Sequence, residues 1–161
     1  MTIQAGWAAA VFGCAAVLAG CGASTPTTPT QTPPPITYEN VAGNYTGAIS
    51  GVSQGVTIAG TLSLNLQQSG GVLSGGGTIV AAMDNGPQGQ GTVTLAGSVA
   101  SGPNPSISLT FRSVPCPNLT SDWSGSFASG SGVLTITGAI NVANSACVNV
   151  RSFPQTILLQ R

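Results

Sequence analysis

Apolar and polar residues alternate along most of the chain after Pro35. The clearest stretch is VTIAGTLSLNLQQ, residues 56–68. Its large apolar side chains share one parity: Val56, Ile58, Leu62, Leu64 and Leu66. A period of two places alternate side chains on opposite faces of a β-strand, so the stretch predicts a strand with one buried face.

The same alternation recurs seven more times, which predicts eight strands and no helix after the apolar leader. Turn sequences such as SGG and DNG separate neighbouring strands and are typical of hairpins. Short turns favour an antiparallel meander. The other seven strands are marked by Tyr45 and Ile49; Leu73 and Ile79; Val93, Leu95 and Val99; Ile107, Leu109 and Phe111; Trp123 and Phe127; Leu134, Ile136, Ile140 and Val142; and Ile157 and Leu159.

Glycines fall on the apolar parity about once per strand. A glycine on the inner face lets a strand bend tightly. We therefore expect an all-β domain, an antiparallel eight-stranded meander closed into a small barrel, which leaves no free edge. The alternatives are a β-sandwich and, less well supported because aromatic girdles are missing, a transmembrane barrel. The glycines that fall on the apolar parity are Gly47, Gly60, Gly75, Gly77, Gly97, Gly125 and Gly138.

Residues 7–20, WAAAVFGCAAVLAG, form an uncharged apolar run. The run is too short to span a bilayer as a helix and has the length of a secretory signal core. Its end, Leu18-Ala19-Gly20-Cys21, resembles the lipobox of bacterial lipoproteins at all four positions. The resemblance implies cleavage before Cys21 and acylation of its thiol, so the membrane is an expected partner through a lipid anchor. Gly22, by resemblance to the sorting rule of enteric bacteria, favours the outer membrane over the inner.

The predicted organisation has three parts. A helical signal segment occupies residues 1–20, a lipidated and disordered linker residues 21–40, and the barrel domain residues 41–161. Ser, Thr and Pro dominate the linker. Pro-rich sequence is extended at about 3.1 Å per residue, so residues 22–35 could reach roughly 40 Å.

Two phrases over the first three predicted strands, VAGNYTGAISG and TLSLNLQQSGGVLSGGGTI, resemble the lipocalin-like barrel lipoproteins of bacteria. A barrel mouth is a common place for a small ligand. The inward aromatic residues that are candidates to line such a site are Tyr45, Phe111, Trp123 and Phe127. The alternative is that they fill the core, because an eight-stranded barrel is only wide enough for side chains.

Two cysteines remain if Cys14 leaves with the leader and Cys21 is lipidated. An exported chain meets an oxidising compartment, so Cys116 and Cys147 are expected to form a disulfide. Their loops lie at the same end of a meander.

Charge is nearly absent, with three Arg, three acidic residues, no Lys and no His. Nucleic-acid binding requires clustered cations and is excluded. The serines have no His or Lys as a base partner, and there is no set of metal ligands. We therefore expect no catalytic residue, no metal and no cofactor, and a protein that is not an enzyme.

These patterns leave two hypotheses for function. The first is a non-catalytic, lipid-anchored cell-envelope protein whose barrel binds a small apolar ligand. The second is a structural or adhesive surface module with a filled core. A cavity of roughly 300 Å³ or more, open at one end, would favour the first.

Overall fold

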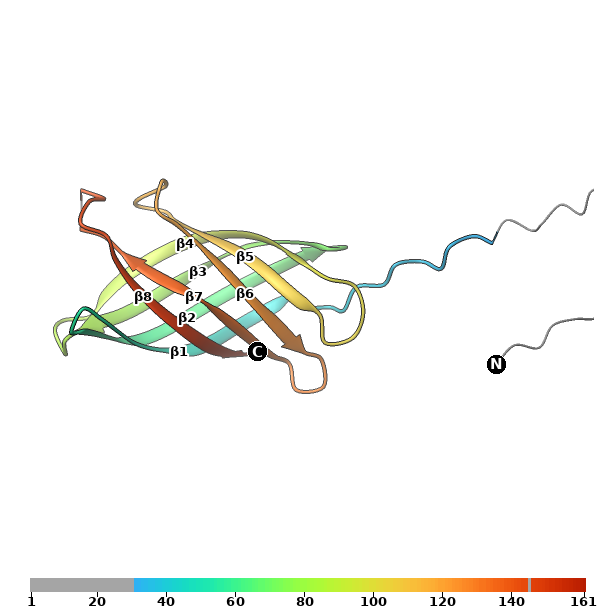
Figure 1. Cartoon of the computed structure of the whole chain (residues 1–161), viewed down its shortest axis with the longest axis horizontal. Coiled ribbons are helices and arrows are strands. Elements are labelled where there is room, and N and C mark those ends of the chain that lie inside the picture. The colour runs from blue at the N-terminus through green and yellow to red at the C-terminus, as the bar shows by residue number, and fades with distance from the viewer. Residues whose placement is uncertain (1–30, 145) are drawn as a thin grey trace, which may run out of the picture. The chain divides into compact units, whose positions relative to one another are not determined.

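The computed structural model describes residues 31–144 and 146–161, so the predicted signal segment, Cys21 and most of the linker lie outside the described residues. The described part contains eight strands and no helix, as the sequence predicts (Figure 1). None of its segments is a helix able to cross a bilayer. The strands are β1 (Gly43–Ser53), β2 (Val56–Ser69), β3 (Val72–Met83), β4 (Gly89–Val99), β5 (Ser106–Ser113), β6 (Thr120–Ala128), β7 (Val133–Val142) and β8 (Arg151–Gln160).

The strands form one closed barrel in chain order, and each is antiparallel to its neighbours. β8 returns to β1 through the pair Thr46↔Gln160. The meander confirms the predicted fold and excludes the β-sandwich.

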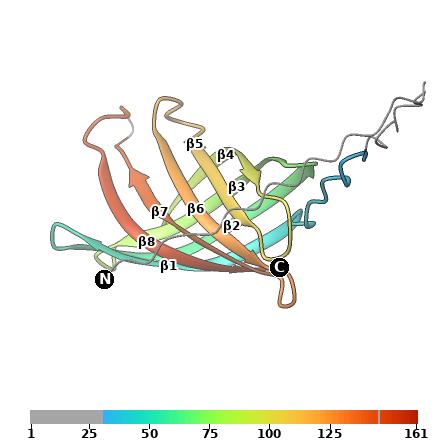
Figure 2. The same cartoon turned by 45° about the vertical axis from the view of Figure 1, so that its right-hand side comes forward.

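The connections between the strands alternate between the two ends of the barrel. The β1–β2, β3–β4, β5–β6 and β7–β8 connections surround what we call the mouth, and the other three lie at the closed end (Figures 1 and 2).

The apolar parity points inward. Leu62, Leu134 and Ile136 are fully buried, whereas the Ser, Thr and Asn residues between the apolar positions are mostly exposed. Ile79 and Val142 are only partly buried because they lie near the mouth. The exterior is thus solvated mainly by hydroxyl and amide groups, as its lack of charge requires.

The inward glycines allow neighbouring strands to approach closely. A Cβ atom on Gly60 would collide with the backbone oxygen of Val80, and one on Gly125 with that of Thr135. All seven predicted glycines have a backbone oxygen of an adjacent strand in this position. The predicted closed barrel is confirmed, and at these glycines a side chain would push neighbouring strands apart.

We expect Gly125→Ala to lower the free energy of unfolding by about 2 kcal/mol or more, because the new methyl group meets backbone that cannot move aside. The matched control is Gly91→Ala on β4, where a Cβ meets nothing within 4 Å. Its effect should stay within about 0.5 kcal/mol. Urea denaturation of both variants measures the difference, and equal effects would contradict the role given to Gly125.

Polar contacts of the preceding segment seal the closed end. The Tyr45 hydroxyl donates to the Val41 carbonyl at 2.9 Å. The side chain of Gln68 accepts from the Val41 amide at 2.8 Å and donates to the Glu39 carbonyl at 2.9 Å. The Arg161 guanidinium lies 5.1 Å from the centre of the Phe127 ring. Arg161 also donates to the carbonyls of Asn40 and Ala42 at 3.3 and 3.1 Å, so these hydrogen bonds hold the chain entering β1 at the closed end.

Burial raises the pKa of the Tyr45 hydroxyl above its ordinary value of 10.0, and the nearby Arg161 guanidinium opposes this shift. The folded state therefore favours the neutral phenol. Stability from this group is fully present below pH 10 and is lost as pH rises above it. We expect the unfolding midpoint in urea to fall as pH rises above 10, and Tyr45→Phe to flatten that fall while losing about 1 kcal/mol at neutral pH with the hydrogen bond. A fall of the same steepness in the variant would contradict this role.

Candidate functional site

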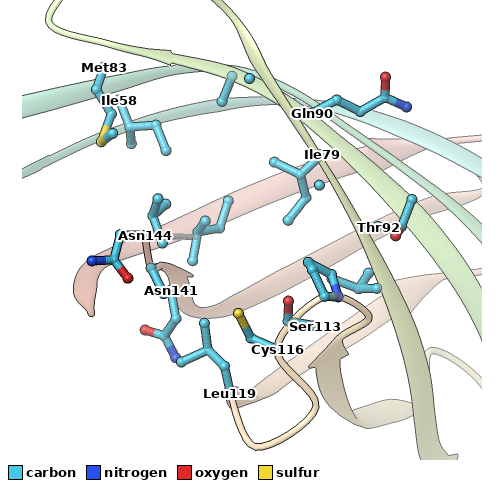
Figure 3. A pocket seen from close by; sticks show the side chains of 18 of the residues that line it. Ile58, Ile79, Met83, Gln90, Thr92, Ser113, Cys116, Leu119, Asn141 and Asn144 are labelled. Atoms are coloured by element: carbon cyan, nitrogen blue, oxygen red, sulfur yellow. The ribbon is translucent and has the colours of Figure 1, made fainter. Parts of the chain in front are cut away.

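A cavity of about 390 Å³ opens at the mouth of the barrel. Figure 3 shows Ile58, Met83, Ile79 and Leu119 around one open space, with Cys116 beside Ser113. The apolar side chains that line the cavity come from β2, β3, β4 and β7 and from connections at the mouth: Ile58, Ile79, Ala81, Met83, Pro87, Val93, Pro115, Leu119, Ile140, Val142 and Ala143. This composition suits an apolar molecule.

The cavity exists because small residues occupy the inward positions at the mouth end of β4 and the position of β3 that pairs with Gly89. Ala81, Gly89 and Gly91 line the cavity there, and beyond Gly91 there is open space. Nearer the closed end the same two strands carry Leu73 and Leu95, which are buried. The barrel is therefore solid at one end and hollow at the other.

The polar part of the cavity wall is neutral in the described part of the chain. It consists of amides and hydroxyls, including Gln90, Ser113 and Asn141. An adjoining hollow of about 360 Å³ shares Met83 and Asn144 with the cavity and adds the charged residues Asp84 and Arg151. The Asp84 carboxylate accepts from the amide and hydroxyl of Thr57 at 2.8 and 3.2 Å, which fixes the β3–β4 turn to the start of β2.

The four candidate aromatic residues separate into two pairs. Phe111 and Trp123 stack with ring centres 5.4 Å apart and line a small hollow of about 30 Å³. This hollow shares Ile79 and Ile140 with the main cavity. Tyr45 and Phe127 are buried toward the closed end, among the contacts with Val41 and Arg161 described above. Only Phe111 and Trp123 are thus close to the cavity, and their role in ligand binding stays a prediction.

Sequence reasoning assigned several cavity residues to the inner face, including Ile79 and Ile140, but did not identify them as a site. The signal that points to them is the pair of small inward residues at the start of β4, Gly89 and Gly91, ahead of the large inward residues Val93 and Leu95. Alternation alone does not reveal this signal. The alternating pattern indicates which face of the sheet a residue lies on, but not how much space lies opposite that residue.

The predicted disulfide is present. Cys116 and Cys147 are bonded, with their Cα atoms 5.5 Å apart and 31 residues apart in sequence. The bond ties the β5–β6 loop to the β7–β8 loop at the mouth, and Cys116 itself lines the cavity. A bridge across a loop of this length stabilises the fold by about 3 to 4 kcal/mol in the chain-entropy model. It therefore fixes part of the cavity wall.

Among the described residues, no three of the His, Cys, Asp and Glu side chains gather in a way that could hold a metal ion. No protein-family model, no curated protein and no solved structure matches this chain. The cavity is accordingly the feature from which a function is inferred.

Proposed function

We propose that this chain is a lipid-anchored protein of the cell envelope whose barrel carries a small apolar ligand in the mouth cavity. The observation that supports ligand carriage most directly is the cavity of about 390 Å³ lined by Ile58, Ile79 and Val142. Ligand pockets usually occupy about 300 to 1,000 Å³ and have mainly apolar walls with a few polar groups. A structural module with a filled core would have no need of this space.

The path of the chain before β1 supports an anchor at the opposite end from the mouth. Tyr38 packs over Gly71, and the Gly102 amide donates to the Thr37 carbonyl at 3.3 Å. Thr37 and Tyr38, near the end of the predicted linker, are thus joined to the closed end. An anchored molecule with this attachment would keep its ligand opening accessible.

The anchor is inferred from Leu18-Ala19-Gly20-Cys21, whose likeness to a lipobox implies acylation of Cys21. Two or three acyl chains give stable membrane attachment, because each buried CH₂ contributes about 0.8 kcal/mol. We infer the outer membrane from Gly22. The barrel would then be held at the membrane by a tether of roughly 40 Å.

Binding of a neutral fluorescent probe, N-phenyl-1-naphthylamine, tests the ligand site. We expect saturable fluorescence enhancement by the native protein and at least about tenfold weaker binding by Gly91→Phe, which places a ring in the open space. The matched control is Thr94→Phe on the outer face of the same strand, which should bind as the parent does. Absence of saturable binding by the parent would favour the structural module, and equal binding by the two variants would place the probe elsewhere.

Membrane fractionation of bacteria that make the full chain tests the anchor. Cys21→Ala should move the protein from the membrane to the soluble fraction of the envelope, since the acylated thiol is lost. Cys14→Ala is the control, because this residue is expected to leave with the signal segment, and it should fractionate as the parent does. Membrane attachment of Cys21→Ala that survives high salt would contradict the proposal.

A further inference from the structure

The β7–β8 hairpin is bonded much more completely within itself than to its neighbours. Its two strands pair along their whole length, from Val133↔Gln160 to Val142↔Arg151. β7 pairs with β6 only from Ser124↔Thr137 to Ala128↔Val133, at the closed end. β8 pairs with β1 only at Thr46↔Gln160, also at the closed end. In the described structure, the mouth half of this hairpin therefore has no ladder to either side. We call this half, Gly138–Val142 and Arg151–Gln155, the flap.

The β6–β7 side of the flap is bridged by a side chain in place of a backbone ladder. Continuation of the register would place Thr120 opposite Asn141, but the two residues are joined by the Asn141 side-chain amide, which donates to the Thr120 carbonyl at 3.0 Å. Below this bridge the ring of Trp123 covers Gly138, where a Cβ would collide with it. The hollow of about 30 Å³ lies along this gap and connects to the cavity wall at Ile140.

The β1–β8 side is bridged in the same manner. Pro154 has no amide hydrogen, so β8 cannot complete a regular ladder at this point. The Gln155 side chain accepts from the Ser50 amide at 3.2 Å and donates to the Phe153 carbonyl at 3.4 Å. A single side chain thus supplies a link that a backbone ladder provides on the other side of β1, between β1 and β2.

The disulfide crosses the open side of the flap. Cys116 precedes β6 and Cys147 lies in the connection that follows β7, so the bond joins the two hairpins beyond the point where their ladder ends. In Figures 1 and 2 these two connections project from the same end of the barrel. Together the disulfide and the Asn141 bridge close the gap between β6 and β7, which the backbone leaves unpaired.

We propose that the flap moves as a hinged unit away from β6 and opens a side entry between β6 and β7 into the cavity, and that the disulfide limits this movement. The proposal rests on the proposed function, because the entry serves the ligand cavity. Flap movement replaces two side-chain hydrogen bonds with bonds to water and breaks no backbone ladder. An apolar molecule would then pass Leu119 and Trp123 instead of the amides at the rim of the mouth.

Acrylamide quenching of Trp123 fluorescence tests the movement without any ligand. The Trp123 side chain is 2% exposed and covers the flap at Gly138, so opening of the flap exposes it to the quencher. The full chain is used with Trp7→Phe, which leaves Trp123 as its single tryptophan. We expect the quenching constant to rise about threefold in the Cys116→Ser/Cys147→Ser variant, because local opening then becomes less restrained.

A matched pair of single substitutions keeps the test valid if the cysteine variant fails to fold. Asn141→Ala removes the bridge across the gap and should raise the quenching constant measurably with the disulfide intact. Asn65→Ala removes a similar side-chain bond, to the Asn44 side chain at 2.6 Å, but between strands that are fully paired. It should leave the constant unchanged. Equal quenching of Asn141→Ala, Asn65→Ala and the parent would overturn the proposal.

Probe association kinetics separate the flap from the ligand site itself. Asn141→Ala should bind N-phenyl-1-naphthylamine severalfold faster than Asn65→Ala. Because Asn141 also lines the cavity, the association rate and not the affinity is compared. If quenching rises but the probe does not bind to any variant, the flap movement is supported and the proposed function is contradicted. If the probe binds to all variants at one rate and quenching is unchanged, the proposed function is supported and the flap movement is contradicted.

Discussion

The structure depends on the close approach of neighbouring backbones at the inward glycines. Eight strands close into so small a ring only if each bends sharply, and a side chain at the bend would collide with the next strand. Gly60 and Gly125 show this constraint directly, because a carbonyl oxygen of the adjacent strand occupies the place of their missing Cβ atoms. Closure in turn removes the free edges that would make such an uncharged β-sheet prone to aggregation.

The same use of small residues has a different outcome at the mouth. At Gly125 the backbone of the neighbouring strand occupies the space that a side chain would take, whereas at Gly91 that space is empty. The closed half is consequently packed around large residues such as Tyr45 and Phe127, and the mouth half contains a cavity. Backbone pairing follows the same division, because the β7–β8 hairpin forms backbone ladders with its neighbours only in the closed half. Packing and hydrogen bonding thus give one rigid end and one adaptable end.

Much of the fold could be predicted from sequence because it depends on parity and on local turns. Alternation identified all eight strands, and the cysteines could be paired because a meander brings their loops to one end. The cavity could not be predicted, since its volume depends on which inward residues lie at the same height in the barrel. Phe111 and Phe127 have the same parity, and only the three-dimensional arrangement places one near the cavity and the other at the closed end. The incomplete β6–β7 ladder likewise has no clear sequence signal, although Pro154 indicates the weak β1–β8 seam.

The cavity at the mouth is the feature that connects this architecture to a biological role. Native mass spectrometry of the intact protein, extracted gently from the membranes of cells that make it, tests this connection most directly. We expect a folded mass that exceeds that of the acylated polypeptide by one small molecule, which is released when the protein is denatured. A folded mass equal to that of the denatured, acylated polypeptide would contradict ligand carriage by the cavity.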